Sequence, residues 1–312
     1  MKALALIPAL LAHSPAASGP TVRGAPVASA PVASAPAASA EPVVTGWTTL
    51  SARERAAFIL AEASLPLGER LMRVSERFLG TPYVHSPLGE GQGVDPDPTF
   101  RLDAVDCLTF VEQSLAMSLA RSDAEVPGLL EQLRYASTPT YEDRNHLMEA
   151  QWLPNNQRKG FLVDVTRRLG GEDTVRVNKT LTALSWSSPS SRALGLSEEH
   201  QPKGVFPLDM IPLERVLAHA RQVPTGTVLV VLREDLPYKV TRVTHVGFVV
   251  HKGKRVWLRH ARRNLDGTGR VVDEDLENFL ARNTRYEWKV SGVSFYEPQQ
   301  PPAPEEALVR SH

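Results

Sequence analysis

The sequence predicts an α+β domain, and three observations lead to this fold class. Segments with apolar residues at helical spacing occupy the first half of the chain, whereas valine-rich apolar runs bounded by turn signals occupy the second half. Helices followed by an antiparallel meander are the α+β layout. The βαβ alternation of nucleotide-binding sheets does not occur in the sequence, and neither does a glycine-rich phosphate loop.

The first two predicted helices follow one another closely. Ser51 is a typical N-cap residue, and Glu54 stands three positions later, which is the capping-box pattern. We therefore expect a helix over residues 51–65. Apolar residues at helical spacing predict a second helix over residues 67–79, and Gly80 is expected to end it.

A loop and two more helices complete the predicted helical part. Residues 81–99 are rich in glycine, proline and aspartate, which predicts a loop. Residues 107–120 are a strong helix candidate because four apolar residues share one face, and residues 126–135 predict a short helix after it. The apolar face of the stronger candidate carries Leu108, Val111, Leu115 and Leu119.

Four apolar runs predict the antiparallel sheet. Residues 228–232 form a continuous run of valine and leucine, which is typical of a buried strand. Residues 245–251 and 255–260 flank a Lys-Gly-Lys turn centred on Gly253, so they are expected to pair as a hairpin. Residues 286–295 are expected to supply the last strand.

The two ends of the chain differ in composition from its middle. A basic start followed by a short apolar stretch indicates an export signal over residues 1–18, with a disordered apolar start as the alternative. Ala/Pro/Ser repeats within residues 19–42 predict an extended linker. The working domain is expected over residues 43–297 and a disordered tail over residues 298–312. A periplasmic or extracellular location follows, without stable membrane insertion after signal removal.

Composition narrows the function classes. The hydrophobic fraction of 42% and the charged fraction of 22% are ordinary for a globular protein. The formal net charge is zero, so the broad basic field that nucleic-acid binding needs is not expected. The sequence contains no zinc-type cysteine pairs and no His-Glu-x-x-His stretch, so we expect no metal site and no cofactor.

The single cysteine is the main candidate for chemistry. Cys107 stands at the start of a predicted helix, where free backbone N–H groups and the helix dipole favour a thiolate. His245 lies far downstream in a strand-like run, and a cysteine and histidine that meet only on folding are typical of a nucleophile and its base, here a thiolate–imidazolium pair. The alternatives are a small buried thiol and a structural histidine on an apolar strand.

His260 is a candidate for the third member of this group. The turn at Gly253 brings His245 close to His260 on the neighbouring strand. A third residue needs only to orient the imidazole, so histidine can stand where other enzymes have Asn or Asp.

These residues also occur in a family-specific order. The motifs are Gly80-Thr81-Pro82-Tyr83, Arg101-x-Asp103-x-x-Asp106-Cys107-x-Thr109-Phe110-Val111-Glu112, Thr244-His245-Val246-Gly247 and Arg259-His260-Ala261. In this order they resemble the NlpC-type, papain-like cell-wall cysteine peptidases. The cysteine motif is similar to that of the N-acetylmuramoyl-L-alanine-amidase-like branch, a domain family of unknown function. The resemblance covers roughly residues 80–295.

The resemblance implies a papain-like α+β fold, in which the nucleophile helix packs against an antiparallel sheet. It implies Cys107 as nucleophile, His245 as base and His260 as third member. It also places Tyr83 near the oxyanion, where the backbone N–H of Cys107 is the natural donor.

Other positions near these motifs keep two interpretations each. Asp106 is either the anchor of a substrate amine or the N-cap of the helix. Arg144, His146 and Trp152 form either a wall that grips peptide or sugar, or a half-buried loop with a packing tryptophan. The charged stretch over residues 233–242 resembles an insertion that can narrow or widen a groove.

The expected function is an exported cysteine hydrolase that cleaves an amide bond of peptidoglycan or a muropeptide, either the muramoyl–L-Ala amide or a stem-peptide bond. The alternatives are an acyltransferase on the same fold and a non-catalytic cell-wall-binding module. We expect a monomer with no nucleic-acid partner.

Overall fold

A computed structural model describes residues 46–301 of the chain. The predicted export signal and linker, and residues 302–312 of the predicted tail, lie outside the described residues. The longer helices are α1 (Ala52–Glu62), α2 (Leu67–Glu76), α3 (Cys107–Leu119), α4 (Val126–Arg134) and α10 (Leu276–Asn283). The shorter helices are α5 (Leu153–Arg158), α6 (Thr166–Gly170), α7 (Ala183–Trp186), α8 (Pro189–Arg192) and α9 (Val216–His219).

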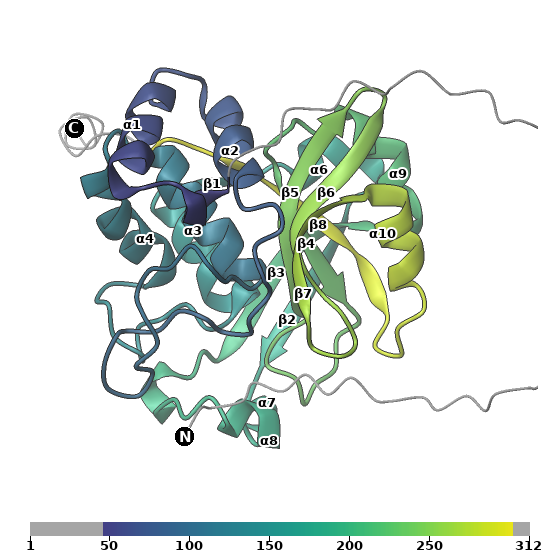
Figure 1. The fold of residues 1–312 in the computed structure, drawn as a ribbon. Helices are drawn as coiled ribbons and strands as arrows, with labels where there is room; N and C mark the ends of the chain where they lie inside the picture. Colours follow the sequence, from purple (N-terminus) through teal and green to yellow (C-terminus); the bar gives the residue numbers. More distant parts are fainter. Residues whose placement is uncertain (1–45, 302–312) are drawn as a thin grey trace, which may run out of the picture.

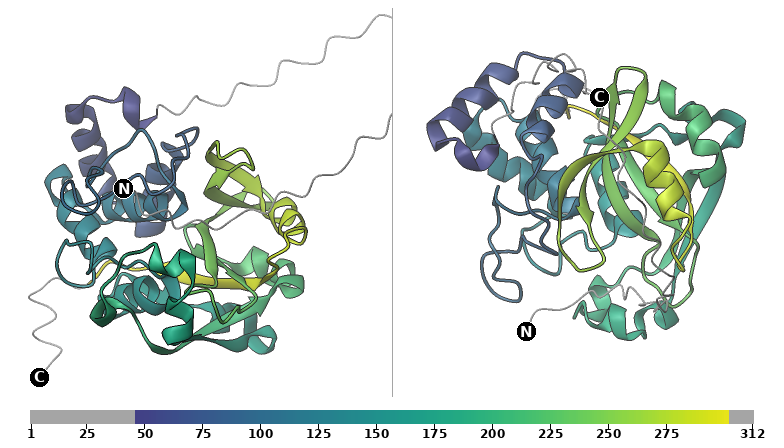
Figure 2. Two further views of the ribbon diagram at one scale, coloured as in Figure 1. Left: turned by 90° about the horizontal axis from the view of Figure 1, so that it is seen from below. Right: turned by 45° about the vertical axis from the view of Figure 1, so that its right-hand side comes forward.

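The strands form one antiparallel sheet in the order β2-β3-β8-β4-β5-β6-β7, and β1 pairs with β8 beside this path. Their bounds are β1 (Leu162–Asp164), β2 (Val175–Leu181), β3 (Gly204–Pro212), β4 (Val228–Arg233), β5 (Val243–Lys252), β6 (Arg255–Arg263), β7 (Gly269–Asp275) and β8 (Val290–Pro298). Helices α1 to α4 lie on one side of this sheet and α9 and α10 on the other (Figure 1). The turned views of Figure 2 show the same separation. The mixed helix and antiparallel-sheet architecture of the prediction is therefore confirmed.

The four predicted N-terminal helices form close to their expected bounds. The Ser51 hydroxyl accepts the N–H of Glu54, and the Glu54 carboxylate accepts the N–H of Ser51 at 2.8 Å, which completes the predicted capping box at α1. After α2 the chain turns at Gly80, which has a positive φ of 84° that residues with a side chain rarely adopt.

Helix α3 is the centre of the molecule. All its residues from Thr109 to Leu119 are buried. Phe110 meets Phe78 near α2 on one side and Phe248 of β5 on the other, with ring centroids 5.7 and 5.5 Å apart, respectively, and both pairs in edge-to-face geometry. This packing fixes the first turn of α3, and with it Cys107, against the sheet.

The opposite face of the sheet has its own apolar cluster. Leu276, Phe279 and Leu280 of α10 pack there against Leu229 and Val231 of β4. The sheet is therefore buried on both faces, which agrees with the unbroken apolar sequence of β4.

The predicted hairpin forms, but part of the sheet was not predicted. Strands β5 and β6 pair around Gly253, whose φ is 59°, as the turn signal required. The last strand starts at Val290 rather than at residue 286, because residues 284–289 are turn and bend after α10. Strand β7 and helix α10 lie between the hairpin and the last strand, and neither was predicted. In the described part of the chain, no helix is long and apolar enough to span a membrane.

Candidate active site

The first turn of α3 presents Cys107 from a tightly capped helix end. The Asp106 carboxylate accepts the backbone N–H and the hydroxyl of Thr109, both at 2.8 Å, and the N–H of Asp106 donates to the Thr109 hydroxyl at 2.9 Å. The second carboxylate oxygen accepts the N–H of Ser86 at 3.1 Å. Asp106 is thus the helix N-cap, and this capping box explains the Asp-Cys-x-Thr spacing of the motif.

The sulfur of Cys107 lies beside the backbone of β5. The backbone N–H of Val246 lowers the pKa of the Cys107 thiol, as do the N–H groups of Leu108 and Cys107, so these groups lie near the sulfur. The pairing of β5 with β6 begins only at Phe248, so the Val246 N–H is not used in that ladder. The sulfur therefore lies near the backbone of Val246, the residue that follows His245.

The thiol is held in its protonated form. Burial and the neighbouring Asp106 carboxylate raise the pKa of Cys107 to about 12, although backbone N–H groups act in the opposite direction. The N–H groups at the start of α3 therefore lower the pKa of Cys107 as predicted, but burial and Asp106 raise it by more. The raised pKa of Cys107 thus favours a neutral thiol over the expected thiolate–imidazolium pair in the resting site.

Two histidines and a glutamate form a hydrogen-bonded chain across β5, β6 and β7. Nε2 of His245 lies 2.7 Å from Nδ1 of His260, and Nε2 of His260 lies 3.1 Å from Oε2 of Glu274 on β7. Arg282 of α10 binds the same carboxylate through two nitrogens, at 3.1 and 2.8 Å, and donates to the Tyr286 hydroxyl. The chain of contacts thus runs from the sheet into α10.

This arrangement determines where the protons lie. The pKa of Glu274 is lowered to about 2, because hydrogen bonds from His260 and Arg282 outweigh burial, so Glu274 is a carboxylate and only accepts. A neutral His260 must then donate from Nε2 and accept at Nδ1. His245 in turn donates from Nε2, which leaves its Nδ1 unprotonated and free to accept a proton.

Both imidazoles are neutral at rest. Burial lowers the pKa of His245 well below its usual value, and the charges of Arg282 and Arg233 act in the same direction. Burial also lowers the pKa of His260, although Glu274 opposes this shift. The ring of Phe279 stacks on His245 with a centroid distance of 5.8 Å and restricts its orientation.

Gly247 is required for the two histidines to meet. A Cβ atom at this position would lie 2.6 Å from the carbonyl oxygen of Arg259 and 2.8 Å from Cβ of His260. Such contacts are too short, so any side chain at residue 247 would displace β6. The glycine of the Thr-His-Val-Gly motif therefore creates the space that His260 occupies.

Tyr83 lies at the same site. Its N–H donates to the carbonyl of Gly269 at 2.9 Å, and the next N–H, of Val84, donates to Val105 at 3.0 Å. Burial raises the pKa of Tyr83, the charges of Cys107 and Asp106 raise it further, and Arg263 opposes this rise. Tyr83 therefore belongs to the same electrostatic environment as the thiol.

Of the two interpretations of Arg144, His146 and Trp152, their contacts favour the structural one. Arg144 forms ion pairs with Glu90 and Asp95 at 2.6 and 2.9 Å, and the ring of His146 is hydrogen-bonded to the Tyr141 carbonyl. These contacts use the polar groups that were expected to grip substrate.

Trp152 is fully buried, and its Nε1 donates to Glu112 at 2.9 Å. A side chain without exposed surface cannot contact a wall polymer, so the packing interpretation of this tryptophan is the correct one.

The segment over residues 233–242 is also tied to the body of the protein. Asp235 accepts from the fully buried amine of Lys179 at 2.6 Å, and the backbone N–H of Arg233 donates to the carbonyl of Arg242 at 2.9 Å. Arg233 donates to Thr244 at 2.9 Å, directly before His245. The segment therefore supports the start of β5 rather than standing apart from the fold.

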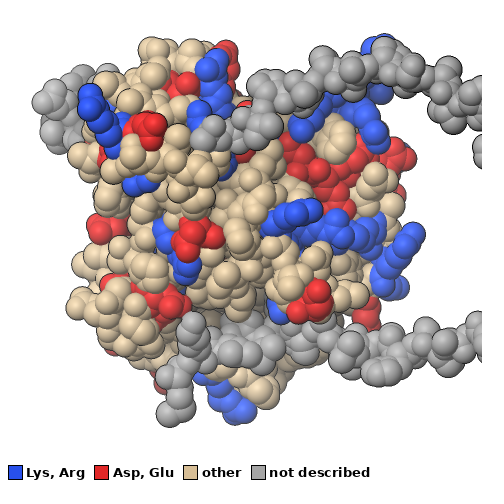
Figure 3. Space-filling view, viewed as in Figure 1, with Lys and Arg blue, Asp and Glu red and all other residues tan. Residues whose placement is uncertain are grey.

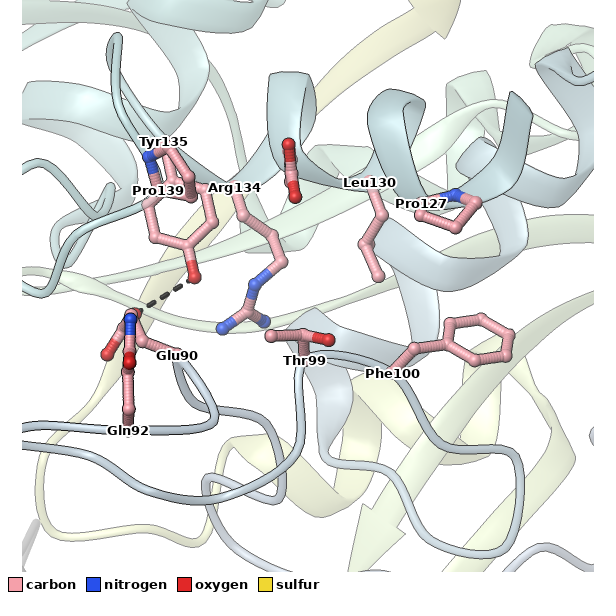
Figure 4. Close-up of a pocket in the computed structure, with 10 residues that line it drawn as sticks. Glu90, Gln92, Thr99, Phe100, Pro127, Leu130, Arg134, Tyr135 and Pro139 are labelled. Atoms are coloured by element: carbon pink, nitrogen blue, oxygen red, sulfur yellow. Dashed lines mark hydrogen bonds between the residues drawn. The ribbon is translucent and has the colours of Figure 1, made fainter. Parts of the chain in front are cut away.

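A separate pocket lies between α4 and the loop before α3 (Figure 4). Its lining includes Glu90, Thr99, Leu130 and Arg134, and none of the residues around Cys107 contributes to it. In the part of the chain described, no cluster of three or more potential metal ligands occurs.

Glu274, Arg282 and Phe279 were not predicted, because the sequence pattern of residues 269–283 suggested no strand or helix. One available signal was Asp266-Gly267, a hairpin turn dipeptide in the loop that follows the predicted strand over residues 255–260. Extending the meander by one strand at this turn would have placed residues 269–275 beside His260.

Comparison with known proteins agrees with this architecture. A Legionella pneumophila protein from a family of unknown function is 22% identical, with a TM-score of 0.67 over 80% of this chain and 94% of its own. An N-acetylmuramoyl-L-alanine amidase from Bacteroides uniformis is 21% identical, with a TM-score of 0.59 over 74% and 99% of the two chains. A Bacteroides fragilis structure named as a candidate xylanase is 21% identical, with a TM-score of 0.57 over 72% and 99%.

At these identities the solved structures show a shared fold only. No curated protein matches the chain. Residues 73–286, however, match the AmiA-like family, described as N-acetylmuramoyl-L-alanine amidase-like. This match covers more than half of the chain and includes Tyr83, Cys107, His245, His260 and Glu274. The chain therefore belongs to the N-acetylmuramoyl-L-alanine amidase-like family.

Proposed function

We propose that this protein is a cysteine hydrolase that cleaves an amide bond in peptidoglycan, either the muramoyl–L-Ala amide or a bond of the stem peptide. The observation that carries the proposal is the chain from His245 through His260 to Glu274, which leaves an unprotonated nitrogen on His245, the residue before Val246, whose backbone lies near the Cys107 sulfur. Family membership supports an amide bond as the target. The B. uniformis neighbour, named as an N-acetylmuramoyl-L-alanine amidase, supports the polymer.

In the first step the thiol of Cys107 attacks the carbonyl carbon of the amide while His245 Nδ1 takes the thiol proton. The transfer accompanies the attack, because both groups are neutral at rest. Glu274 stabilises the positive charge that develops on the two imidazoles, as an acidic group does in other hydrolytic triads.

The carbonyl oxygen becomes an oxyanion in this step. As the first two residues of α3, Cys107 and Leu108 carry N–H groups that the helix itself does not satisfy. These groups point at the region of the sulfur and can donate to the oxyanion. Tyr83 stands at the same place with a hydroxyl that is strongly biased towards its protonated form.

The tetrahedral intermediate then collapses. The carbon–nitrogen bond breaks, the leaving amine takes the proton from His245, and Cys107 remains as a thioester. Water attacks the thioester, gives a proton to His245 and releases the carboxylic acid, and this proton returns to the sulfur. The reaction consumes one water molecule and needs no cofactor.

The xylanase description of one structural neighbour fits this site less well. Glycoside hydrolysis ordinarily uses two carboxylates on opposite sides of a sugar bond. Around Cys107 and His245, the carboxylate of Glu274 is occupied by His260 and Arg282, and that of Asp106 by the helix end. The site therefore fits attack by a thiol better than glycoside hydrolysis by two free carboxylates.

The finer expectations of the sequence analysis belong to the same proposal. They are a papain-like, NlpC-type arrangement of nucleophile helix and sheet, and export through a signal and a linker before residue 43. A periplasmic or extracellular location gives the enzyme access to its substrate.

The test is digestion of purified sacculi with the wild-type protein and with Cys107→Ala. We expect the wild type to release muropeptide fragments and the variant to release none. Mass analysis of the fragments identifies the bond, and an added amine that appears in the products would indicate acyl transfer. Unchanged release by Cys107→Ala would refute the assignment, and binding without cleavage by the wild type would indicate a wall-binding module.

A further inference from the structure

Three arginines gather at the end of the β6–β7 hairpin. Arg262 and Arg270 stand directly opposite each other in the ladder, and Arg263 follows on the same strand. Among residues 46–301, no carboxylate forms an ion pair with these three side chains. Two like charges at opposed positions destabilise a strand pair. Their arrangement therefore stores an unfavourable interaction that an anion would relieve.

The rest of the same ribbon is built differently. Arg259 pairs with Asp273 at 2.7 Å, and Arg255 pairs with Asp275 at 2.9 Å. Each of these arginines thus has its charge compensated from β7. The uncompensated charges are confined to the end of the ribbon near the hairpin tip. Figure 3 shows basic side chains gathered over the part of this face where Figure 1 draws β7 and α10.

This end of the ribbon is fixed beside the candidate active site. The N–H of Tyr83 donates to the carbonyl of Gly269 at 2.9 Å, and Pro82 forms a β-bridge with Arg270. The positive charge of Arg263 lowers the pKa of Tyr83, and that of Arg262 lowers the pKa of His260. The arginines therefore border the place where the substrate amide would meet Cys107.

We propose that the facing pair of Arg262 and Arg270 binds a carboxylate of the substrate peptide close to the scissile amide. This inference rests on the proposed function and adds to it the charge of the substrate that is preferred. Arginine suits the task because its planar guanidinium can donate two parallel hydrogen bonds to one carboxylate. The three side chains are wholly or partly exposed, so a peptide can reach them without rearrangement of the fold.

The test compares two synthetic muropeptides that differ only in their stem-peptide carboxylates, free in one and amidated in the other. The wild type is expected to cleave the free-acid form with a kcat/KM about tenfold higher, which corresponds to one charge-assisted hydrogen bond. The Arg262→Gln/Arg270→Gln variant is expected to lose this preference through a higher KM for the free-acid form.

Lys254→Gln is the matched control, because it removes one exposed positive charge from the opposite end of β5 and β6. This variant should prefer the free-acid muropeptide over the amidated one to the same extent as the wild type. Thermal unfolding gives a second readout: the double variant should be no less stable than the wild type, because it removes an opposed pair of like charges.

Binding separates this inference from the proposed function. Titration of both muropeptides into Cys107→Ala by calorimetry should show about tenfold tighter binding of the free-acid form, even if the wild type cleaves neither. Equal affinity for both forms, or a preference that survives in the double arginine variant, would overturn the inference. Absence of cleavage together with the expected binding preference would overturn only the proposed function.

Discussion

The protonation of Cys107 and His245 is the feature on which the chemistry depends at the scale of single residues. Free N–H groups at the start of α3 favour a thiolate, but burial and Asp106 raise the pKa of Cys107 to about 12. Burial lowers the pKa of His245 at the same time. The sequence revealed the pair of residues but not this balance, because burial and the second carboxylate contact of Asp106 arise only on folding.

This balance predicts how the thiol reacts with iodoacetamide. Below the pKa of Cys107 the thiolate fraction rises tenfold per pH unit, so the inactivation rate should rise about tenfold per unit between pH 7 and 9. Mass spectrometry of the single cysteine follows the reaction. His245→Ala should show a similar slope, and a rate that is already constant at neutral pH would indicate a preformed thiolate–imidazolium pair.

Glu274 is predicted to act as a positioning residue through His260. In Glu274→Gln the negative charge that raises the pKa of both imidazoles is lost. We expect kcat to fall by roughly ten- to a hundredfold, and the acid limb of the kcat/KM profile to move to lower pH. A lost structural contact alone would lower activity without moving the limb.

Glu277→Gln is the control for this variant, because it removes an exposed carboxylate from the neighbouring turn of α10. It should leave both kcat and the pH profile unchanged. An acid limb that stays in place in Glu274→Gln would show that the carboxylate does not act on the imidazoles.

At the scale of elements, the sequence predicted those whose signals are local. The capping boxes at Ser51 and Asp106 and the Gly253 turn each involve residues within four positions, and α1, α3 and the β5–β6 hairpin form there. The capping role of Asp106 was one of two open interpretations. Strand β7 was missed because its acidic side chains pair across strands, as Asp273 does with Arg259, which no single-strand pattern reveals.

Gly247→Ala tests the fit between β5 and β6. The added methyl group would lie within 3 Å of the Arg259 carbonyl and of His260, so β6 must move. We expect a loss of about 1–3 kcal/mol in the free energy of unfolding and at least a tenfold loss of kcat/KM. Urea unfolding and muropeptide hydrolysis measure the two effects.

Gly128→Ala provides the matched control, because a Cβ in this exposed turn of α4 meets no atom within 4 Å. It should raise stability by about 0.5–1 kcal/mol and leave activity unchanged. A fully active Gly247→Ala protein would contradict the view that the glycine makes room for His260.

For the whole molecule, buried polar groups join the helical layer to the sheet. Arg259 of β6 donates to the Met72 carbonyl at 3.0 Å and to Ser75 at 3.1 Å. Within the helical layer, Glu112 of α3 binds both Arg134 and Trp152. The sequence marked Glu112 and Trp152 as motif residues, but their partners are 22 and 40 positions away, respectively, so a structural role could not be separated from a functional one.

Trp152→Phe distinguishes these roles. The variant removes the indole donor to Glu112 and leaves a small cavity, so we expect the free energy of unfolding to fall by about 2–3 kcal/mol. The kcat/KM of the folded protein should stay within about twofold of the wild type, because Trp152 has no exposed surface. A large loss of kcat/KM without a loss of stability would restore the substrate-binding interpretation.

The central claim is that Cys107 forms a covalent acyl intermediate with His245 as its base. Acid quenching of the protein during turnover of a muropeptide, followed by mass spectrometry of the intact chain and of its peptides, tests this claim most directly. We predict a mass increase equal to the acyl fragment, located on Cys107, and its loss in Cys107→Ala and His245→Ala. Muropeptide cleavage that proceeds at the wild-type rate in Cys107→Ala, with no adduct on the wild-type cysteine, would contradict it.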